Sequence, residues 1–412
     1  MGGFGSSRPV LRRELVDDGR PAHSVEDGEG RSCLGGRLLV VARAGIFRHN
    51  LFVPSETFIR AQAGALSRYS PTFIARRAIT DRPEGVDAVA LSSRVGTVGD
   101  ALYGMTGTSR ALNRLVAEQN LDIVHAHFGP DGLYAVGAVK SAKVPLVVTL
   151  HGRDVTVSKQ ALIATRRPMA VNYALRRLSL GTHAELLICV SDQIRQSALA
   201  LGLPENKLLT HYIGVDTELF AVAPWPRPPQ IIHVARLVEK KGTADLISAF
   251  AAVAGKHSDA TLRIIGDGPL MESLVAQVAT LGLTDRVVFL GRQSEEAVRR
   301  EIGASRIFAL PSVTAANGDR EGLPIALVEA MSLGTAVVST RHSGIPEAVS
   351  TDTVGILVAE HDVDGLAASL DHLLGDEVAA RALGLAAAAH VASNFDLVKQ
   401  TQKLESLYDS AR

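Results

Sequence analysis

Short runs of Val, Ile, Leu and Ala alternate with longer helical stretches along most of the chain. This pattern predicts buried parallel strands joined by helices, because a strand that is covered on both faces is apolar throughout. In the first half, the apolar runs lie at Arg37–Val41, Ile123–His125, Leu146–Leu150 and Leu186–Val190. In the second half, they lie at Gln230–Val234, Thr261–Ile265, Val287–Leu290, Ile307–Leu310 and Ala336–Ser339. We therefore predict an α/β protein with one parallel sheet in each half.

The chain is expected to begin with an extension and to contain a stiff connection near its middle. Residues 1–36 are rich in Gly, Ser and charged residues and poor in large apolar ones, so we expect them to be disordered. The first domain then spans residues 37–216. Residues 217–229 follow as a linker, because the prolines crowded there favour an extended, stiff segment.

The second domain is expected to span residues 230–390, followed by a terminal helix over residues 391–412. Within the tail, Phe395, Val398, Leu404 and Leu407 recur at spacings that keep them on one helical face. An apolar face of this kind must pack against something, and the helix could cross back to the first domain.

Length and composition exclude several classes of protein. A chain of 412 residues exceeds what one core usually spans, and only 4% of it is aromatic. No run of about 18 apolar residues occurs, so we expect no transmembrane helix. The N-terminus lacks the apolar core of a signal peptide. The two cysteines, Cys33 and Cys189, form no CxxC pattern, which favours reduced thiols and a cytoplasmic location over disulfides or a metal site.

Charge divides the chain into two unlike halves. Residues 37–216 carry 21 Lys and Arg against 13 Asp and Glu, whereas residues 217–412 carry 17 against 24. Arginine pairs supply much of the excess in the first half: Arg76/Arg77, Arg166/Arg167 and Arg176/Arg177. They could bind the anionic inner face of a cell membrane or a phosphate-linked acceptor, or they could be ordinary solvated helix faces. Nucleic acid is disfavoured because no binding motif accompanies the charge.

The segment Glu321–Glu329 carries the most informative chemistry. Its Gly-Leu-Pro element, Gly322 to Pro324, indicates a helix start with Pro324 in the first position. Free N–H groups at a helix start can bind phosphate, and Glu321 and Glu329 stand on either side of it. Eight helical steps would separate the two acids by about 12 Å, beyond the roughly 5–9.5 Å of a glycoside hydrolase pair. Two separated acceptors fit a nucleotide sugar, although a surface helix with two exposed acids is the simpler alternative.

Two basic residues follow the end of a predicted strand in the second half of the chain. Arg236 and Lys241 come directly after the apolar run Gln230–Val234, where open α/β sheets bind ligands, and they suit a diphosphate leaving group. Gly266 closes the next strand in a Gly-Asp-Gly-Pro turn, which would let a ligand approach the backbone or simply form a turn. Asp362 and Asp364 resemble a metal-binding Asp-x-Asp, but they precede a helix that Asp would cap.

Polar residues also follow strands in the first half. His151 lies beyond Leu146–Leu150 and could bond a sugar hydroxyl, stabilise charge, or merely satisfy a neighbouring carbonyl. His125 and His127 share one strand face, but no third metal ligand is evident, so we expect a position in the cleft. Ser55 is expected to cap the first helix and to present backbone donors to an anion. The first strand is followed by no GxGxxG, which argues against an NAD-linked dehydrogenase.

In these residues the sequence resembles the retaining glycosyltransferases of family 4, which have the GT-B fold. Glu321–Glu329 matches the family's E-x7-E motif, Arg236 and Lys241 match its basic pair, and Thr340–Glu347 matches its T-x-x-S-G-I-P-E stretch. Three further segments are similar to bacterial exopolysaccharide transferases of the colanic-acid type: Pro54–Ile59, His125–Phe128 and His151–Asp154. One departure is the first loop, Arg43-Ala44-Gly45, where many relatives carry a Gly-Gly pair.

The resemblance implies two Rossmann-like domains with parallel sheets facing across a cleft, the second holding the nucleotide sugar and the first a saccharide or lipid-linked acceptor. Glu329 would bind ribose, Glu321 the hexose, Arg236 and Lys241 the diphosphate, and His151 the sugar near the reaction centre. The remaining implied donor residues are Gly322, Leu323, Pro324, Ile325 and Gly266, with Arg292 and Gln293 at the base. The acceptor-side residues are Ser55, Glu56, His127 and Asp154.

The resemblance also implies transfer with retention, in which a donor phosphate oxygen helps to deprotonate the acceptor hydroxyl. No cofactor or metal ion is then expected, because cations and a helix start neutralise the leaving diphosphate. Two other classes remain open at this point. A nucleotide-sugar 2-epimerase would isomerise the donor without an acceptor, and a non-catalytic subunit would bind the donor without transferring its sugar.

Overall fold

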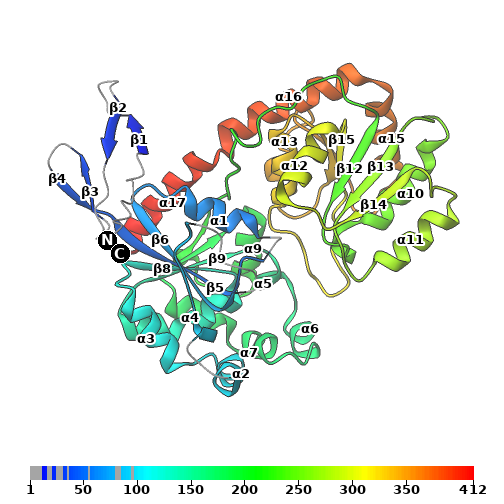
Figure 1. Ribbon diagram of the computed structural model, residues 1–412. Coiled ribbons are helices and arrows are strands. Elements are labelled where there is room, and N and C mark those ends of the chain that lie inside the picture. The colour runs from blue at the N-terminus through cyan, green and yellow to red at the C-terminus, as the bar shows by residue number, and fades with distance from the viewer. Residues whose placement is uncertain are drawn as a thin grey trace, which may run out of the picture.

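Two separate parallel sheets form the framework of the molecule (Figure 1). The computed structural model describes residues 12–15, 21–24, 31–34, 37–53, 56–78, 85–93 and 97–412. The first sheet has seven strands in the order β11-β10-β9-β8-β5-β6-β7, and the second has six in the order β14-β13-β12-β15-β16-β17. Every neighbouring pair in both sheets is parallel. Helices cover the sheets, as the predicted α/β class and GT-B architecture require.

The first sheet belongs to the N-terminal domain. Its strands are β5 (Ala42–Leu51), β6 (Tyr69–Ala78), β7 (Ala88–Ala90), β8 (Ile123–His127), β9 (Leu146–Leu150), β10 (Leu186–Cys189) and β11 (Leu208–Thr210). Its helices are α1 (Thr57–Gly64), α2 (Thr97–Thr106), α3 (Arg110–Glu118), α4 (Gly129–Ala142), α5 (Arg153–Thr156), α6 (Lys159–Ala164), α7 (Pro168–Arg176), α8 (Leu180–His183) and α9 (Asp192–Ala200). Every residue of β8 and β9 is buried, which explains why both strands could be predicted from the sequence.

The second sheet belongs to the C-terminal domain. Its strands are β12 (Gln230–Val234), β13 (Thr261–Ile265), β14 (Val287–Gly291), β15 (Ile307–Leu310), β16 (Ala336–Thr340) and β17 (Ile356–Val358). Its helices are α10 (Thr243–Ala254), α11 (Met271–Thr280), α12 (Glu295–Ala304), α13 (Ile325–Ser332), α14 (Ile345–Ala348), α15 (Val363–Gly375) and α16 (Glu377–Asn394). Two apolar clusters, around Phe250 and around Phe308, bury this sheet between its helices.

The first predicted strand forms, but it does not belong to the parallel sheet. Arg37–Val40 forms β4, which pairs antiparallel with β3 (Arg31–Leu34), and the parallel sheet begins in the chain with β5, which lies between β8 and β6. The sequence hides β5 because Arg48 and His49 are polar residues in its buried part. Arg48 is tolerated there because Asp131 and Glu56 pair with it, which local patterning does not reveal.

Part of the predicted disordered extension forms strands in the structure. β1 (Arg12–Leu15) pairs antiparallel with β2 (Pro21–Ser24), and β3 also lies in this extension. Short antiparallel pairs are joined by backbone hydrogen bonds, which composition alone does not predict. The other residues of 1–36 lie outside the described part of the chain.

The predicted terminal helix over residues 391–412 is interrupted, because residues 391–394 end α16 and a new helix begins at Leu397. α16 packs on the C-terminal domain, the chain breaks at Phe395 and Asp396, and α17 (Leu397–Ala411) lies against the N-terminal domain (Figure 1). The break occurs because the Asp396 side chain caps α17 by accepting from the N–H of Lys399. Buried Glu405 then accepts from the N–H groups of Ser67 and Arg68, both at 2.6 Å.

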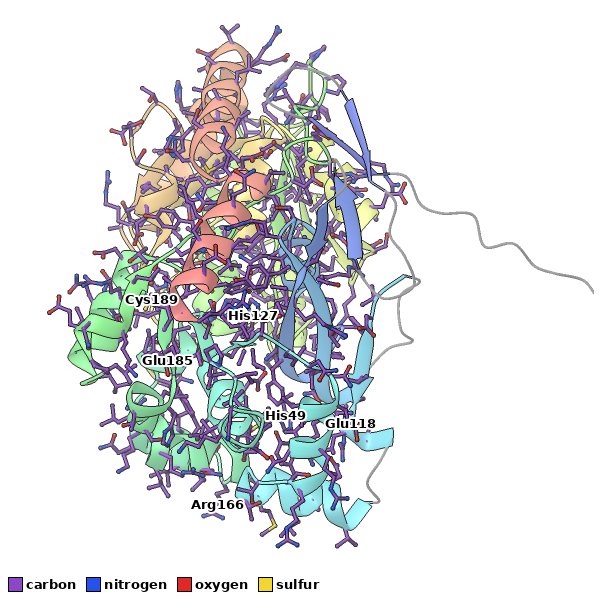
Figure 2. All side chains as sticks on the ribbon, turned by 90° about the vertical axis from the view of Figure 1, so that its left-hand side faces the viewer. His49, Glu118, His127, Arg166, Glu185 and Cys189 are labelled. Carbon is purple, nitrogen blue, oxygen red and sulfur yellow. The ribbon has the colours of Figure 1, made fainter. Side chains whose placement is uncertain are left out.

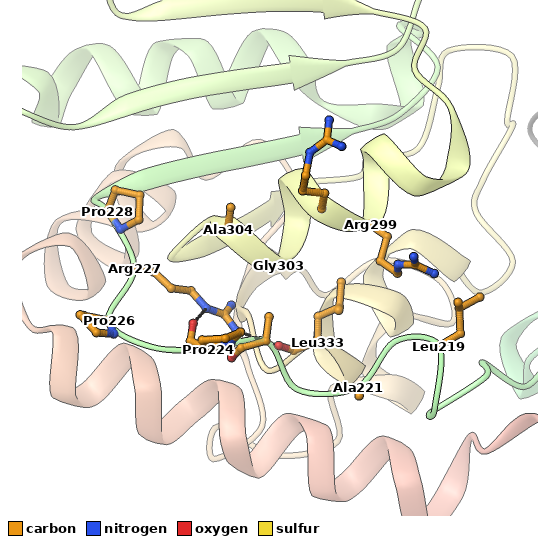
Figure 3. Close-up of a pocket in the computed structure, with 12 residues that line it drawn as sticks. Leu219, Ala221, Pro224, Pro226, Arg227, Pro228, Arg299, Gly303, Ala304 and Leu333 are labelled. Carbon is orange, nitrogen blue, oxygen red and sulfur yellow. Dashed lines mark hydrogen bonds between the residues drawn. The ribbon is translucent and has the colours of Figure 1, made fainter.

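Arg227 is one of the residues that join the linker to the C-terminal domain. Arg227 is buried and donates to the carbonyl oxygens of Ala223, Pro224 and Leu333 (Figure 3). Beside it, a groove of about 490 Å³ lies between the linker and α12. None of the residues predicted to bind donor or acceptor lines this groove. Among the described residues, no helix is both long and apolar enough to span a bilayer.

Candidate functional site

The Glu321–Glu329 element forms the predicted loop and helix start. α13 begins at Ile325, and Pro324 is its N-cap, one position earlier in the helix than predicted. Proline offers no capping side chain, so no side-chain bond satisfies the first N–H groups of α13. Glu321 is buried in the preceding loop, and Glu329 is half-buried in the second turn. The helix start therefore retains the donors that an anion would need.

The Thr340–Glu347 stretch holds Glu321 in place. The backbone N–H of Glu321 donates to Nε2 of His342 at 3.1 Å, and Nδ1 of His342 lies 2.7 Å from Oε1 of Glu360. The hydroxyl of Ser343 donates to the carbonyl oxygen of Glu321 at 2.6 Å. His342 thus accepts at Nε2 and donates at Nδ1, which defines its neutral tautomer. Sequence reasoning missed His342 and Glu360, because their role depends on contacts between distant segments.

Two lysines surround the Glu321 carboxylate. Nζ of Lys241 lies 3.0 Å from Oε1 of Glu321, and Nζ of Lys240 lies 3.7 Å from the same oxygen. Burial alone would raise the pKa of Glu321, but the charges of Lys241 and Lys240 outweigh it and hold the pKa below its usual value. Glu321 is therefore a fixed anion next to the start of α13. Lys240, which also pairs with Asp319 at 3.1 Å, was not predicted.

Arg236 is a free cation beyond the end of β12. Its side chain is exposed and forms no ion pair with any residue that the structure describes. An unpaired guanidinium can make bidentate contacts with phosphate without first breaking an internal salt bridge. Arg292, by contrast, pairs with Asp267 at 3.3 Å, and the side chain of Gln293 donates to the carbonyl oxygen of Leu290 at 2.6 Å.

Gly266 fixes the loop that carries Arg236. Its φ is +133°, and a Cβ there would lie 1.8 Å from the carbonyl oxygen of Ala235. Only glycine permits this approach of two loops at the carboxyl ends of β12 and β13. The turn therefore determines where the Arg236 backbone lies, whether or not Gly266 touches a ligand.

Gly266→Ala is expected to lower the free energy of unfolding by about 1–3 kcal/mol or more, because it adds both backbone strain and overlap. Thermal unfolding measures this change, and transferase activity should fall with it. Gly255→Ala is the matched control, since a Cβ at Gly255 meets nothing within 4 Å and the φ there is −67°. Equal melting temperatures for the two variants would contradict this role of Gly266.

His151 lies at the end of β9 and faces the N-terminal domain's other histidines. Its Nε2 is 3.2 Å from Nδ1 of His127, and its ring stacks on Phe128 with centroids 4.2 Å apart. Burial, followed by the charge of Arg48, lowers the pKa of His151 well below its usual value. Burial thus favours the neutral ring, whose one N–H can donate to a sugar hydroxyl, a developing anion or a neighbouring carbonyl. His127 lies in the interior of the domain (Figure 2).

Arg48 organises the acceptor side and was missed by sequence reasoning. Its guanidinium pairs with Asp131 and with Glu56, and it donates to the carbonyl oxygen of His127 at 3.1 Å. Glu56 is therefore held 2.6 Å from Arg48 instead of being a free acceptor-binding group. Ser55 lies outside the described residues.

Asp154 supports the backbone instead of presenting a free carboxylate. It is buried, and it accepts from the N–H of His151 at 2.7 Å. Burial raises its pKa to about 6, and hydrogen bonds from the backbone of His151 and Gly129 oppose the rise. Asp154 therefore fixes the turn on which His151 stands.

The two domains meet at His151 and Glu321. A Cβ on Gly322 would lie 2.4 Å from the carbonyl oxygen of His151, and a Cβ on Gly152 would lie 3.0 Å from the backbone nitrogen of Gly322. Glycines at these positions allow the loops of both domains to touch. Nearby, the Glu347 carboxylate accepts from the N–H groups of Asp192 and Gln193 at the start of α9. His151 and Gly322, one predicted residue from each domain, thus meet at this interdomain contact.

Comparison with known proteins agrees with this arrangement. A family model described as Glycosyltransferase Family 4 matches residues 55–219, and one described as Glycosyl transferases group 1 matches residues 215–390. The amylovoran biosynthesis glycosyltransferase AmsK of Erwinia amylovora is 35% identical over 71% of this chain and 72% of its own length. The chain belongs to glycosyltransferase family 4. The family resemblance of the sequence is confirmed.

Other members of family 4 are similar over comparable lengths. A putative colanic acid biosynthesis glycosyltransferase, WcaL of Escherichia coli, is 35% identical over 63% of this chain and 63% of its own length. A GDP-mannose-dependent phosphatidylinositol monomannoside mannosyltransferase of Mycolicibacterium smegmatis is 30% identical over 73% and 80%. The crystal structure of Anabaena HepE with UDP and glucose covers 90% of this chain and 100% of its own, with a TM-score of 0.72 and 20% identity. That structure confirms the GT-B fold. Family 4 enzymes retain the anomeric configuration.

Proposed function

We propose that this family 4 enzyme transfers a hexose from a nucleoside-diphosphate sugar to a saccharide or lipid-linked acceptor, in the synthesis of a bacterial cell-surface polysaccharide. The observation that carries the proposal is the Lys241–Glu321 pair beside the uncapped start of α13. The similarity to AmsK, WcaL and the phosphatidylinositol mannosyltransferase supports the acceptor classes. We assign it to the cytoplasmic face of the cell membrane, where nucleotide sugars would be available.

In this proposal the donor is held along its whole length. The start of α13, Arg236 and Lys241 bind the diphosphate, because each offers N–H donors or positive charge. Glu321 accepts hydrogen bonds from hexose hydroxyls, and Glu329 accepts from the ribose. Neutral His151 bonds a sugar hydroxyl from the opposite domain. Gly322, Leu323 and Ile325 line the diphosphate, and Arg292 and Gln293 border the base.

The reaction needs no protein nucleophile in this arrangement. The bond between the anomeric carbon and the diphosphate oxygen breaks, and the acceptor oxygen bonds to that carbon on the same face. The acceptor proton passes to a phosphate oxygen of the leaving diphosphate. Arg236 and Lys241 stabilise the negative charge that grows on the diphosphate, and charge contacts of this kind are worth most in the transition state.

Transferase activity is expected to survive removal of divalent metal ions. The diphosphate charge is neutralised here by Arg236, Lys241 and the helix start, which chelation does not remove. Initial rates of nucleoside diphosphate release, measured with and without excess EDTA, should agree within about twofold. Loss of activity on chelation, restored by Mg²⁺ or Mn²⁺, would contradict this part of the mechanism.

Donor affinity is expected to rise as the pH increases from 6 to 8. Burial, followed by the charge of Glu295, raises the pKa of Glu329 to about 7. Ribose hydroxyls that donate to the carboxylate favour its ionised form, so bound donor lowers the pKa and binding releases a proton. Titration calorimetry at several pH values measures the trend. In Glu329→Gln the affinity should be lower at pH 8 and nearly independent of pH, and an unchanged pH dependence would contradict the assignment.

The experiment that tests the function is a calorimetric screen of nucleotide sugars, followed by product analysis with the tightest binder. We expect one donor to bind and its sugar to appear on a saccharide or lipid-linked acceptor with retained configuration. An isomerised sugar formed from the donor alone would identify an epimerase. Donor binding without transfer to any acceptor pool would identify a binding subunit.

A further inference from the structure

Helix α2 presents an apolar stripe to the solvent. Val98, Leu102 and Met105 are spaced four and three residues apart, which places them on one face of the helix. Their side chains are 83%, 57% and 62% exposed. A buried face would be expected for such a pattern on a helix of a globular domain. Here the buried face of α2 is a different one, which includes Asp100 and Tyr103.

A second apolar group adjoins the first. Leu175 on α7 and Leu178 in the following 3₁₀ turn, η2 (Arg177–Ser179), are 61% and 51% exposed. α2 and α7 are in contact, and the side chain of Asn172 on α7 donates to the carbonyl oxygen of Met105 at 3.4 Å. Figure 1 shows both helices at the end of the N-terminal domain farthest from α16. Together these five residues form what we call the α2–α7 face.

Unpaired cations border the α2–α7 face. From Val155 to Ala184 the chain contains five Lys and Arg and no Asp or Glu. Arg166, Arg167 and Arg176 are exposed and form no ion pair with residues in the described part of the chain. Arg166 lies at the lower end of the molecule in Figure 2, the end that α2 occupies in Figure 1.

The other arginines of the predicted pairs form contacts within the N-terminal domain. Arg76 and Arg77 both pair with Asp100, the only acid on α2, which is buried between them. Arg177 is buried and donates to the carbonyl oxygen of Val157 at 2.9 Å. These pairings hold α2 in place and leave no exposed acid on α2 or α7 to repel an anionic partner.

We propose that the α2–α7 face docks on an anionic lipid bilayer, with its apolar side chains in the acyl boundary and its arginines among the headgroups. Exposed apolar residues with unpaired arginines at both ends of α7 match the chemistry of such a surface. The proposal rests on the proposed function, because it explains how a lipid-linked acceptor reaches the cleft. α5 contacts the C-terminal domain through Arg153 and Asp319, 3.2 Å apart, and α6 begins three residues after α5. Since α6 packs on α7, the α5–α7 segment connects the interdomain contact with the α2–α7 face.

Vesicle co-sedimentation of the full chain tests the proposal, with phosphatidylcholine vesicles and with vesicles that also contain phosphatidylglycerol. We expect binding only to the anionic vesicles. Arg166→Gln/Arg167→Gln should weaken it about twenty-fivefold, that is about fivefold or 1 kcal/mol per arginine near the surface. Leu102→Glu/Leu175→Glu should reduce it at least as much. Val378→Glu is the control, since Val378 is 79% exposed on α16 in the other domain and its replacement should change nothing.

Three outcomes would overturn the proposal. The first is equal binding to both kinds of vesicle or to neither, and the second is unchanged binding by the charge and apolar variants. The third is a dimer in light scattering that Leu102→Glu/Leu175→Glu dissociates, which would show that a second copy covers the face. Donor affinity and transfer to an acceptor without its lipid should be normal in all three variants. Loss of these activities in the unmodified chain would instead refute the proposed function.

Discussion

Replacing Lys241 with methionine is expected to reduce kcat by about a hundredfold or more, the scale of losing one preorganised charge contact in a transition state. Lys241 stands 3.0 Å from Glu321 and beside the start of α13, so its charge is fixed where the leaving diphosphate gains negative charge. Methionine keeps most of the side-chain volume and removes only the ammonium group. Steady-state rates of donor turnover measure the effect.

Lys241→Met should also lower the stability of the fold, because the buried Glu321 carboxylate would keep only the more distant Lys240 as a positive neighbour. An uncompensated buried charge destabilises the fold. The double variant Lys241→Met/Glu321→Gln should therefore recover the melting temperature but not the activity. Lys256→Met provides the control, since Lys256 is an exposed lysine of the same domain that pairs with Asp371. Near-normal kcat in Lys241→Met would contradict the role of Lys241.

Arg236→Ala is expected to cost about a hundredfold in kcat while leaving the melting temperature unchanged. Activity should fall without a loss of stability because Arg236 is exposed and forms no ion pair within the described residues. The stability of the fold therefore does not depend on its charge. The proposed contact of its guanidinium is with the diphosphate of the bound donor, so the contact is absent from the free enzyme. Rates and thermal unfolding of the same preparation measure both quantities.

Arg292→Ala is the matched comparison for Arg236→Ala. Arg292 is also exposed, but it pairs with Asp267 at 3.3 Å and is proposed to border the base. Its loss should raise the KM for the donor with little change in kcat, because the base is bound equally in the ground and transition states. If both arginine variants changed only KM, Arg236 would not act on the leaving group.

The second domain could be predicted from its sequence because its buried parallel strands are continuous apolar runs. All five strands predicted there, β12 to β16, follow the predicted bounds to within a residue. In the first domain, β5 and β6 escaped prediction because they carry charged residues in partly buried positions. Arg48 is paired with Asp131, and Arg76 with Asp100, across long stretches of chain. No local pattern can show that such charges are compensated.

The same limit applies to the candidate site. Glu321, Glu329, Arg236 and Lys241 could be predicted because motif spacing relates them to a helix start and a strand end. His342 could not, since its bond to the Glu321 backbone joins two segments in one tautomeric arrangement. Asp154 was assigned to the acceptor side by the resemblance to family 4, but its carboxylate accepts from backbone N–H groups. Which atoms of a polar residue are already bonded depends on tertiary contacts.

A crystal structure of the enzyme with an unhydrolysed nucleoside-diphosphate sugar tests the central claim most directly. We predict diphosphate oxygens within about 3 Å of the first N–H groups of α13 and of the Arg236 and Lys241 side chains. Glu329 should contact the ribose, and Glu321 the hexose. A donor bound elsewhere, or an empty cleft with both carboxylates facing water at saturating donor, would contradict the account.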